Sequence, residues 1–224
     1  MITSSSNSQM KQIVKLHKSA RERKKADSYL VEGLRMFLEV PAGRLIKAYA
    51  TETFYEAHRS LLSDKPYELV GENVFKTMSD TITPQGILCV VKKEHWQLDT
   101  LLETEKPLFI ALENIQDPGN LGTIIRTAEG AGATGIIMSR DTVDIYNSKT
   151  VRATMGSIFR VPFVYVEDML QTAERLQAAG VNTYAGHLQG TDMYAEDYTG
   201  ASAFFIGNEG NGLSKDLTDA VSSR

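Results

Sequence analysis

The stretch "LFIALENIQDPGNLGTIIRTAEG", residues 108–130, decides the fold. A short apolar run gives way to a loop of Asn, Gln, Asp, Pro and Gly, after which apolar residues recur at helical spacing. The stretch therefore predicts a buried strand, a loop and a helix. Ligands of open α/β sheets bind beyond the carboxyl ends of the strands, so the loop over 114–120 is a candidate binding site.

Short apolar strands and helices alternate on both sides of this stretch. Residues 107–224 predict a parallel sheet with helices on both faces, and residues 1–95 predict a smaller α/β layered domain. The polar residues 96–106 predict the linker between the two domains. The expected fold class is therefore α/β throughout.

The composition is ordinary for a globular protein, with 42% hydrophobic and 23% charged residues among 224. No apolar run approaches the roughly 18 residues that cross a bilayer, and no secretory signal begins the chain. Cys89 is the only cysteine and lies in the apolar run "GILCVV", so we expect a buried side chain in a cytoplasmic protein. Four scattered histidines and one cysteine have no metal-ligand spacing, so no metal is expected.

Basic residues concentrate near the N-terminus of a chain whose net charge is −4. Residues 10–27 predict a basic helix, and within residues 11–25 seven Lys or Arg oppose only Glu22. A basic arm on an acidic body is typical of phosphate-backbone binding, although a solvated helix face explains the charge equally well. The candidate phosphate-binding residues of this arm are Lys18, Arg21, Arg23, Lys24 and Lys25.

The glycine-rich segment 130–135, "GAGATG", matches the GxGxxG dinucleotide fingerprint. That fingerprint binds pyrophosphate where a strand precedes it and a helix follows. Here a predicted helix precedes it and the strand "IIMS" follows. We therefore interpret Gly130 and Gly132 as helix C-cap glycines and reject a nicotinamide site.

Two further strands are predicted to end on the same edge of the sheet as the loop over 114–120. "FFIGNEGNG", residues 204–212, places three glycines and Glu209 after an apolar strand, which fits a ligand cradle better than a plain turn. "YAGH", residues 184–187, ends another strand. Three strand ends are therefore expected to meet in one place.

Arg126 is a candidate partner of the loop over 114–120. It lies six residues beyond Asn120, and its long side chain can reach back because helical side chains lean toward the N-terminus. A surface arginine with a buried stem is an equally good interpretation of this position.

At this point the residues resemble those of a known family. "ENIQDPGNLGTIIRTAEGAGATGII" and "FFIGNEGNGLS" resemble the first and second signature motifs of the SpoU (TrmH-like) branch of the SPOUT RNA methyltransferases. "VRATMGSIFRVPF" resembles the segment between them, and the match covers most of residues 108–215. The N-terminal half, with "YLVEG" and "TPQGILCVV", resembles an RNA-binding domain similar to ribosomal protein L30e.

The resemblance implies S-adenosylmethionine as methyl donor, a ribose 2′-hydroxyl of RNA as acceptor, and a homodimer with sites at the subunit interface. Ribosomal RNA is the expected substrate, and a deep trefoil knot is expected in the C-terminal domain. A non-catalytic RNA-binding relative that has lost the cofactor is the alternative. By motif, the catalytic residues are Asn120, Arg126 and Glu209, the cofactor contacts are Gly186, His187, Ile206, Gly207 and Gly210, and Arg152 joins the RNA-binding set.

The expected chemistry needs an aligned ribose hydroxyl that loses its proton. Arg126 is a poor base because the pKa of an arginine stays above about 12, so we interpret it as a bidentate clamp on the target phosphate. Glu209 would orient Arg126 or Asn120, and no residue is assigned as the base. The family's third motif, an Ile-Pro-Met strand followed by Ser-Leu-Asn, does not occur before Arg224, so we expect the native chain to continue.

Overall fold

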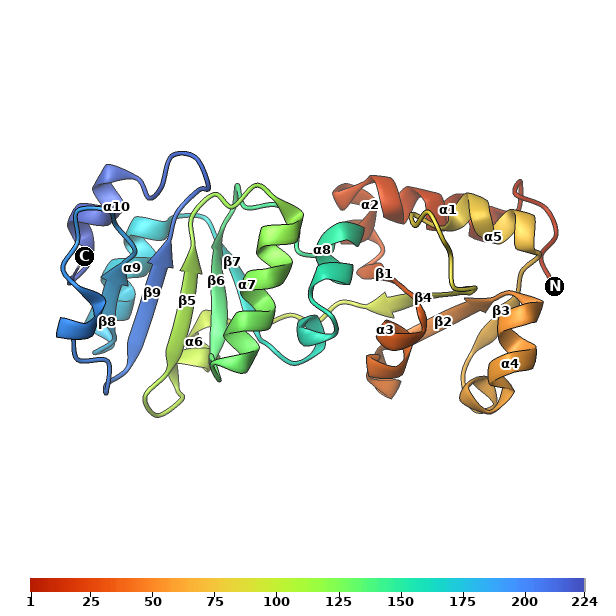
Figure 1. The fold of residues 1–224 in the computed structure, drawn as a ribbon, viewed down its shortest axis with the longest axis horizontal. Helices are drawn as coiled ribbons and strands as arrows, with labels where there is room; N and C mark the ends of the chain where they lie inside the picture. Colours follow the sequence, from red (N-terminus) through yellow and green to blue (C-terminus); the bar gives the residue numbers. More distant parts are fainter. Residues whose placement is uncertain (224) are drawn as a thin grey trace. The chain divides into compact units, whose positions relative to one another are not determined.

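The computed structural model describes residues 1–223, so Arg224, the last residue of the predicted methyltransferase domain, lies outside the described residues. The chain forms two compact units (Figure 1). The first contains Met1–Glu94 and Asp144–Phe159, and the second contains His95–Val143 and Arg160–Arg224. Each unit combines a sheet with helices, which confirms the predicted α/β class.

The first unit is built on a four-stranded sheet in the order β1-β4-β2-β3. β4 runs antiparallel to β1 and β2, whereas β3 runs parallel to β2. The strands are β1 (Ser28–Glu32), β2 (Leu45–Ala50), β3 (Tyr67–Leu69) and β4 (Ile87–Lys92). The helices are α1 (Ser8–Lys18), α2 (Ala20–Lys25), α3 (Leu34–Glu39), α4 (Glu52–Leu62), α5 (Glu72–Met78) and α8 (Ser148–Ala153), with 3-10 turns at Ala42–Arg44 and Ser157–Phe159.

Two helices replace the single basic helix predicted over residues 10–27. Ile13 and Leu16 are buried on one side of α1, as their spacing predicts. Ser19 then adopts an extended backbone, and its side chain accepts a hydrogen bond from the amide of Glu22. Ser19 is thus the N-cap of α2, a position that serine favours, and it separates the two helices.

The core of the first unit packs α1 and α5 against the sheet, with Met10, Phe75, Met78 and Leu88 among its buried residues. Cys89 in β4 is also fully buried. Burial raises the pKa of its thiol, because a thiolate would lose its hydration. The prediction of a buried cysteine is confirmed.

The segment Asp144–Phe159 groups with the first unit although it interrupts the sequence of the second. The division predicted from sequence, with contiguous domains on either side of residues 96–106, does not anticipate this excursion. Its first residue, Asp144, forms an ion pair of 2.7 Å with Arg23, and Ser148 lies 2.9 Å from the ring of His17. These contacts between residues far apart in sequence leave no mark in local patterns.

The second unit is built on five parallel strands in the order β7-β6-β5-β9-β8. This arrangement confirms the predicted parallel sheet. The strands are β5 (Leu108–Leu112), β6 (Gly135–Ser139), β7 (Phe163–Val166), β8 (Asn182–Ala185) and β9 (Ser202–Ile206). The helices are α6 (Leu98–Leu102), α7 (Pro118–Gly130), α9 (Met169–Ala178) and α10 (Lys215–Ala220), with a 3-10 turn at Met193–Ala195.

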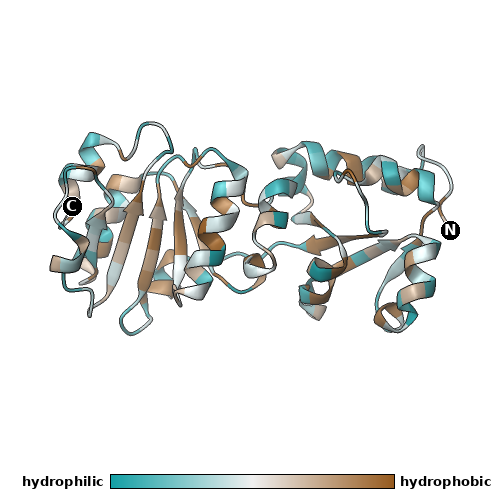
Figure 2. Ribbon diagram, in the orientation of Figure 1, coloured by the Kyte–Doolittle hydropathy of each residue, from teal (hydrophilic) through white to brown (hydrophobic). Residues whose placement is uncertain are grey.

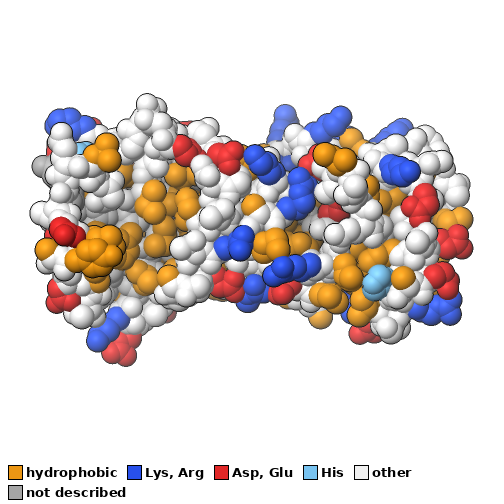
Figure 3. Space-filling model, in the orientation of Figure 1, with side chains coloured by type: hydrophobic (Ala, Val, Ile, Leu, Met, Phe, Trp, Pro, Cys, Tyr) orange, Lys and Arg blue, Asp and Glu red, His pale blue; other side chains and the backbone are white. Residues whose placement is uncertain are grey.

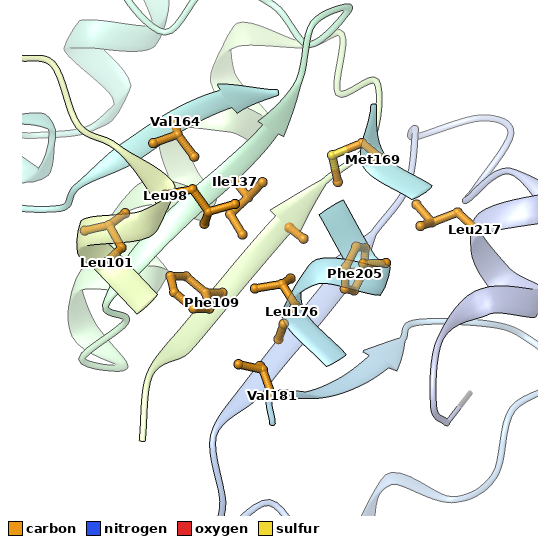
Figure 4. Close-up of a cluster of buried hydrophobic side chains, with 13 residues drawn as sticks. Leu98, Leu101, Phe109, Ile137, Val164, Met169, Leu176, Val181, Phe205 and Leu217 are labelled. Carbon is orange, nitrogen blue, oxygen red and sulfur yellow. The ribbon is translucent and has the colours of Figure 1, made fainter. Parts of the chain in front are cut away.

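Hydrophobic side chains of this sheet are buried on the face that α6, α9 and α10 cover (Figure 4). Phe109 of β5 and Phe205 of β9 are fully buried there and pack with Leu176 of α9. Figure 2 shows that the hydrophobic residues of the unit concentrate in the strands. α7 packs on the opposite face through Leu121 and Ile125.

The order of the strands reverses between β5 and β9. From β5 the chain moves to β6 and β7 on one side, whereas β9 and β8 lie on the other. A crevice at the carboxyl ends of such a strand pair is where open α/β sheets bind ligands. The loops that follow β5 and β9 are those singled out in the sequence.

The GxGxxG match lies between α7 and β6, in the reversed order that the sequence predicts. Gly130 is the last residue of α7, and Gly132 has a φ of +71°, which glycine adopts without strain. The interpretation as a helix end is confirmed. Within residues 1–223, no helix is long and apolar enough to cross a membrane.

Candidate active site

The first candidate loop connects β5 to α7. Asp117 is the N-cap of α7, since its side chain accepts a hydrogen bond of 2.8 Å from the amide of Asn120, and Pro118 occupies the first helical turn. Asn114 has a left-handed φ of +58°, and Ser139 of β6 accepts a hydrogen bond of 2.8 Å from its amide. These contacts fix the direction in which the loop leaves the sheet.

The second candidate loop, which follows β9, folds back on itself. The backbone groups of Asn208 and Gly212 exchange two hydrogen bonds, of 3.0 and 2.9 Å. Gly207 lies so close to the backbone of Gly212 and Leu213 that an added Cβ would overlap with it. The side-chain amide of Asn208 donates to the carbonyl of Asn114 at 2.8 Å, which ties the two loops together.

Glu209 makes the second link between the loops. Its carboxylate accepts hydrogen bonds from the backbone amides of Gln116 and Asp117, both at 3.1 Å. It also accepts one of 3.2 Å from the side-chain amide of Asn120. The structure therefore brings together two of the three predicted catalytic residues, Asn120 and Glu209.

The same hydrogen bonds decide the ionisation of Glu209. Its slight burial works to raise the pKa, but hydrogen bonds from backbone amides, including those of Asp117 and Gln116, and from Asn120 outweigh that effect. The pKa of Glu209 consequently lies below its ordinary value. At neutral pH this side chain is an ionised acceptor and holds its neighbours in place.

Arg126, the third predicted catalytic residue, is not brought into contact with the other two. It is exposed on α7, and its side chain forms no hydrogen bond or ion pair with any other residue of 1–223. Its guanidinium, with five donors, is therefore available to a ligand.

The predicted cofactor residues lie at the ends of β8 and β9. The amide of Gly186 donates to the carbonyl of Phe205 at 3.0 Å, which joins the two strand ends. Gly186 and His187 line a cavity of about 650 Å³, whose wall also contains Tyr184 and Phe204. Ile206 is 39% exposed at the end of β9, and Gly210 is exposed in the loop that follows.

These residues suit a ligand that is held through backbone groups. No backbone hydrogen bond within residues 1–223 uses the amide of His187 or of Gly207. The missing side chain at Gly207 is what allows the loop to close against the backbone of Gly212 and Leu213. The site therefore fits the cofactor that the sequence motifs imply. No group of three His, Cys, Asp or Glu in the described part of the chain could hold a metal ion.

Comparison with known proteins identifies the family. The SpoU rRNA Methylase family model matches residues 107–224, more than half of the chain. This chain belongs to the SpoU rRNA methylase family. The MRM3-like substrate binding domain model matches residues 7–89 of the same chain.

Relatives of this SpoU family member are similar over most of its length. It is 32% identical over 220 residues to the 23S rRNA (guanosine(2553)-2′-O)-methyltransferase RlmP of Bacillus subtilis, a match that covers 97% of this chain and 86% of that protein. An rRNA methyltransferase from Sinorhizobium meliloti has a TM-score of 0.85 at 30% identity, covering 99% of this chain and 86% of its own. The AdoMet-bound form of that enzyme has a TM-score of 0.84. AviRb from Streptomyces viridochromogenes, in complex with AdoMet, has a TM-score of 0.84 at 26% identity, covering 97% of this chain and 87% of its own.

These findings confirm the resemblance read from the two motifs, the SPOUT methyltransferase fold and the enzyme class. They support a methyltransferase and not the non-catalytic alternative. The individual site residues stay predictions, except where the structure of this SpoU family member bears on them.

Arg23 corrects the predicted RNA-binding set of this SpoU family member. It is 4% exposed, because its guanidinium is engaged by the Asp144 carboxylate and by the carbonyls of Leu16 and His17. Sequence reasoning counted it with the basic arm because nothing local distinguishes a buried arginine from an exposed one. The remaining members of the arm are exposed: Lys18, Arg21, Lys24 and Lys25.

Arg152 lies in α8 and is partly exposed, with Asp80 3.5 Å away. It remains accessible, unlike Arg23. Figure 3 shows Lys and Arg side chains on the visible face of the molecule over α1, α2 and α8. Because α8 groups with the first unit, Arg152 and the basic arm belong to the same unit.

Sequence reasoning assigned no role to three polar residues that build the loops of this family member. Asn208 joins the loops, and the side chain of Gln116 donates to the carbonyl of Asp141 at 2.8 Å. Glu113 accepts hydrogen bonds from the amide and hydroxyl of Ser214, at 2.6 and 2.8 Å, at the start of α10. Their position directly after buried strands could have marked these polar residues as candidates. Their hydrogen-bond partners could not be predicted, because they lie more than 20 residues away in sequence.

Proposed function

We propose that this protein transfers a methyl group from S-adenosylmethionine to the 2′-hydroxyl of a ribose in ribosomal RNA. Membership of the SpoU family and the 2′-O-methyltransferase activity in the names of its relatives support this function. The observation that carries it is the link from Glu209 to Asn120 and to the amides of Gln116 and Asp117. That link joins the two signature motifs at the point where the strand order reverses.

The cofactor supplies an electrophilic methyl group on a sulfonium ion. We propose that Gly186, His187, Ile206, Gly207 and Gly210 hold it, mainly through backbone groups at the ends of β8 and β9. A backbone cradle is rigid, since its donors move only with the strands that carry them.

The residues of the first motif act on the RNA in this proposal. Glu209 keeps Asn120 oriented, and the carbonyl oxygen of the Asn120 side chain stays available as an acceptor. The free guanidinium of Arg126 binds the phosphate next to the target ribose in bidentate fashion. Holding the hydroxyl in line with the methyl group is the main contribution, and such alignment supplies several kcal/mol of a typical barrier.

RNA selection belongs to the first unit in this proposal. The exposed Lys18, Arg21, Lys24 and Lys25, with Arg152, bind phosphates of the RNA. The protein acts in the cytoplasm as a homodimer, and the C-terminal domain contains the knot that the family resemblance implies.

The test is methyl transfer with S-adenosylmethionine that carries a radioactive methyl group. Ribosomal RNA and transfer RNA are offered separately, and labelled RNA is then hydrolysed with alkali. A 2′-O-methyl group protects the following phosphodiester, so label is expected in dinucleotides from ribosomal RNA. Label in mononucleotides would indicate base methylation, and label in transfer RNA alone would contradict the ribosomal substrate.

A further inference from the structure

Glu113, which directly follows β5, contacts the residues at both ends of the loop over 207–213. Its backbone amide donates to the carbonyl of Ile206, the last residue of β9, at 2.9 Å. Its carboxylate accepts hydrogen bonds from the amide and the hydroxyl of Ser214, at 2.6 and 2.8 Å. One residue of the second unit therefore holds the chain immediately before and immediately after this loop.

The contact with Ser214 replaces the usual role of a serine at the start of a helix. Ser214 is the N-cap of α10, and an N-cap serine commonly accepts a hydrogen bond from the second or third amide of its own helix. None of the described amides of α10 donates to its hydroxyl, which donates to Glu113 instead. The serine thus connects the end of the loop to the residue after β5.

The loop between these two ends is closed by its own hydrogen bonds. The backbone groups of Asn208 and Gly212 bond to each other, and the side-chain oxygen of Asn208 accepts from the amides of Gly210 and Asn211 at 2.9 and 3.0 Å. Glu209 lies inside this closed turn. The direction in which Glu209 points is therefore set by the places where the loop is held.

We propose that Glu113 is a positioning residue for Glu209. By holding both ends of the loop, it sets the direction in which the Glu209 carboxylate meets the amides of Gln116 and Asp117 and the side chain of Asn120. In this role Glu113 acts through the loop and not on the RNA or the cofactor. Displacements of about 1 Å in such supports can cost roughly 10²-fold in rate.

Stabilisation of α10 alone is the alternative role for Glu113, because a carboxylate near the start of a helix is favourable. The pKa of Glu209 distinguishes the two roles. Burial works to raise this pKa, and the hydrogen bonds that Glu209 accepts outweigh that effect, so loss of these bonds raises the pKa. Removal of the Glu113 charge by itself does not raise it, since fewer negative charges favour the ionised form.

The test replaces the side chain of Glu113 in two ways. Glu113→Ala removes the charge and both hydrogen bonds to Ser214. Glu113→Gln also removes the charge, but its amide can still accept from the Ser214 backbone and donate to the hydroxyl. The pKa of Glu209 is measured by NMR of its carboxyl carbon, and kcat and KM for RNA are measured alongside. Glu105→Ala, at an exposed position of the same unit, is the matched control.

For Glu113→Ala we expect the pKa of Glu209 to rise toward the ordinary glutamate value of about 4.3 and kcat to fall about 10- to 100-fold. KM for RNA should stay within twofold, because the basic residues proposed to bind RNA belong to the first unit. Glu113→Gln should retain the lowered pKa of Glu209 and most of kcat, and Glu105→Ala should match the parent protein. The kinetic part rests on the proposed methyltransferase function, whereas the pKa of Glu209 does not.

Ser214→Ala serves as a second disruption, because it removes the bond from the hydroxyl and leaves the charge of Glu113. It should raise the pKa of Glu209 by a smaller amount. An unchanged pKa of Glu209 in folded Glu113→Ala, or in Ser214→Ala should Glu113→Ala not fold, would overturn the inference. So would an equal loss of kcat in the Ala and Gln variants, because the charge would then be responsible. Absence of methyl transfer by the parent protein would refute the proposed function, and the pKa of Glu209 would still decide the role of Glu113.

Discussion

At the scale of single residues, the Glu209 carboxylate accepts three hydrogen bonds from the loop that follows β5 and from α7. Gln116, Asp117 and Asn120 all donate to its carboxylate. Protonation would weaken these bonds and leave the hydrogen bond from Asn208 to the carbonyl of Asn114 as the remaining link between the two loops. The carboxylate is therefore best understood as the fixed point around which the two motifs are arranged.

The ionisation of Glu209 gives a first prediction. Its pKa is lowered in the folded protein, so its stabilising effect is complete above the ordinary glutamate pKa of about 4.3 and is lost as the pH falls through the lower value. We expect the amide chemical shifts of Gln116 and Asp117 to stay constant from pH 7 to about pH 4.3. A transition of these amides between pH 5 and 7 would show that Glu209 titrates near neutrality.

Arg126 gives a second prediction. Arg126→Ala should abolish methyl transfer and leave the affinity for S-adenosylmethionine within about twofold, because its guanidinium forms no hydrogen bond or ion pair with any other described residue. Arg126→Lys should recover only part of the rate, since an ammonium group lacks the bidentate fork. Calorimetric titration with the cofactor is the check, and lost cofactor binding would exclude the phosphate clamp.

Gly207 gives a third prediction, from its lack of room for a side chain. Gly207→Ala would force its Cβ into the backbone of Gly212 and Leu213, and overpacking of this kind costs about 1–3 kcal/mol. Denaturant unfolding measures the loss, and cofactor affinity should fall with it. Gly130→Ala is the matched control, because a Cβ added there meets no atom within 4 Å outside its own helix backbone and chain neighbours. If both variants unfold with the stability of the parent protein, Gly207 does not lack room for a side chain.

At the scale of elements, the basic arm consists of two helices, α1 and α2. Neighbouring basic residues of α2 differ in exposure, since Arg23 is buried and Lys24 and Lys25 are exposed. Ser19 divides the arm, and the turn it creates allows Arg23 to point inward while Lys24 and Lys25 stay exposed. A single straight helix was the natural prediction, because a serine within a helix-forming sequence is compatible with both outcomes. The N-cap bond to Glu22 settles the choice in the folded chain.

The exposed residues of α2 give a fourth prediction. Replacing Lys24 and Lys25 with Gln should weaken RNA binding and lower the slope of log affinity against log salt by about 2, near one unit for each phosphate contact. Filter binding at several salt concentrations measures this slope. Replacing Arg35 and Lys76, which are exposed on other helices, makes the same charge change and should leave the slope unaltered.

The element that sequence predicted best is the strand, loop and helix over 108–130. Apolar periodicity and turn residues specify it locally, and the structure has β5 and α7 in that register. The grouping of the segment Asp144–Phe159 with the first unit was not predicted, because it depends on contacts with residues distant in sequence and not on a local pattern. Its place depends on Arg23, Tyr29 and His17, which lie more than 100 residues earlier in the chain.

At the scale of the whole molecule, the sheet order explains why the motifs lie far apart in sequence. β5 and β9 are neighbours in the sheet, so the loops that follow them meet although about 90 residues separate Glu209 from Gln116. Sequence reasoning placed both loops on one edge because parallel strands share a carboxyl end. It could not specify the bonds between Glu209 and Asn120, which require the register of β5 and β9.

The proposed homodimer gives a fifth prediction. The Arg126 side chain forms no hydrogen bond or ion pair with Asn120 or Glu209 within one chain, and the family resemblance implies sites at a subunit interface. Light scattering after size-exclusion chromatography should give twice the mass of one chain at micromolar concentration. A monomer that still methylates RNA would show that one chain contains a complete site.

The burial of Cys89 has a practical consequence for studying this protein. Its thiol is inaccessible in β4 and its pKa is raised, so maleimide reagents will leave it unmodified while the protein is folded. A cysteine introduced at an exposed position, such as Gln12 of α1, would then be the sole site of labelling. The chain can therefore carry a single fluorophore without removal of its native cysteine, and energy transfer to a dye on the RNA could report binding in real time.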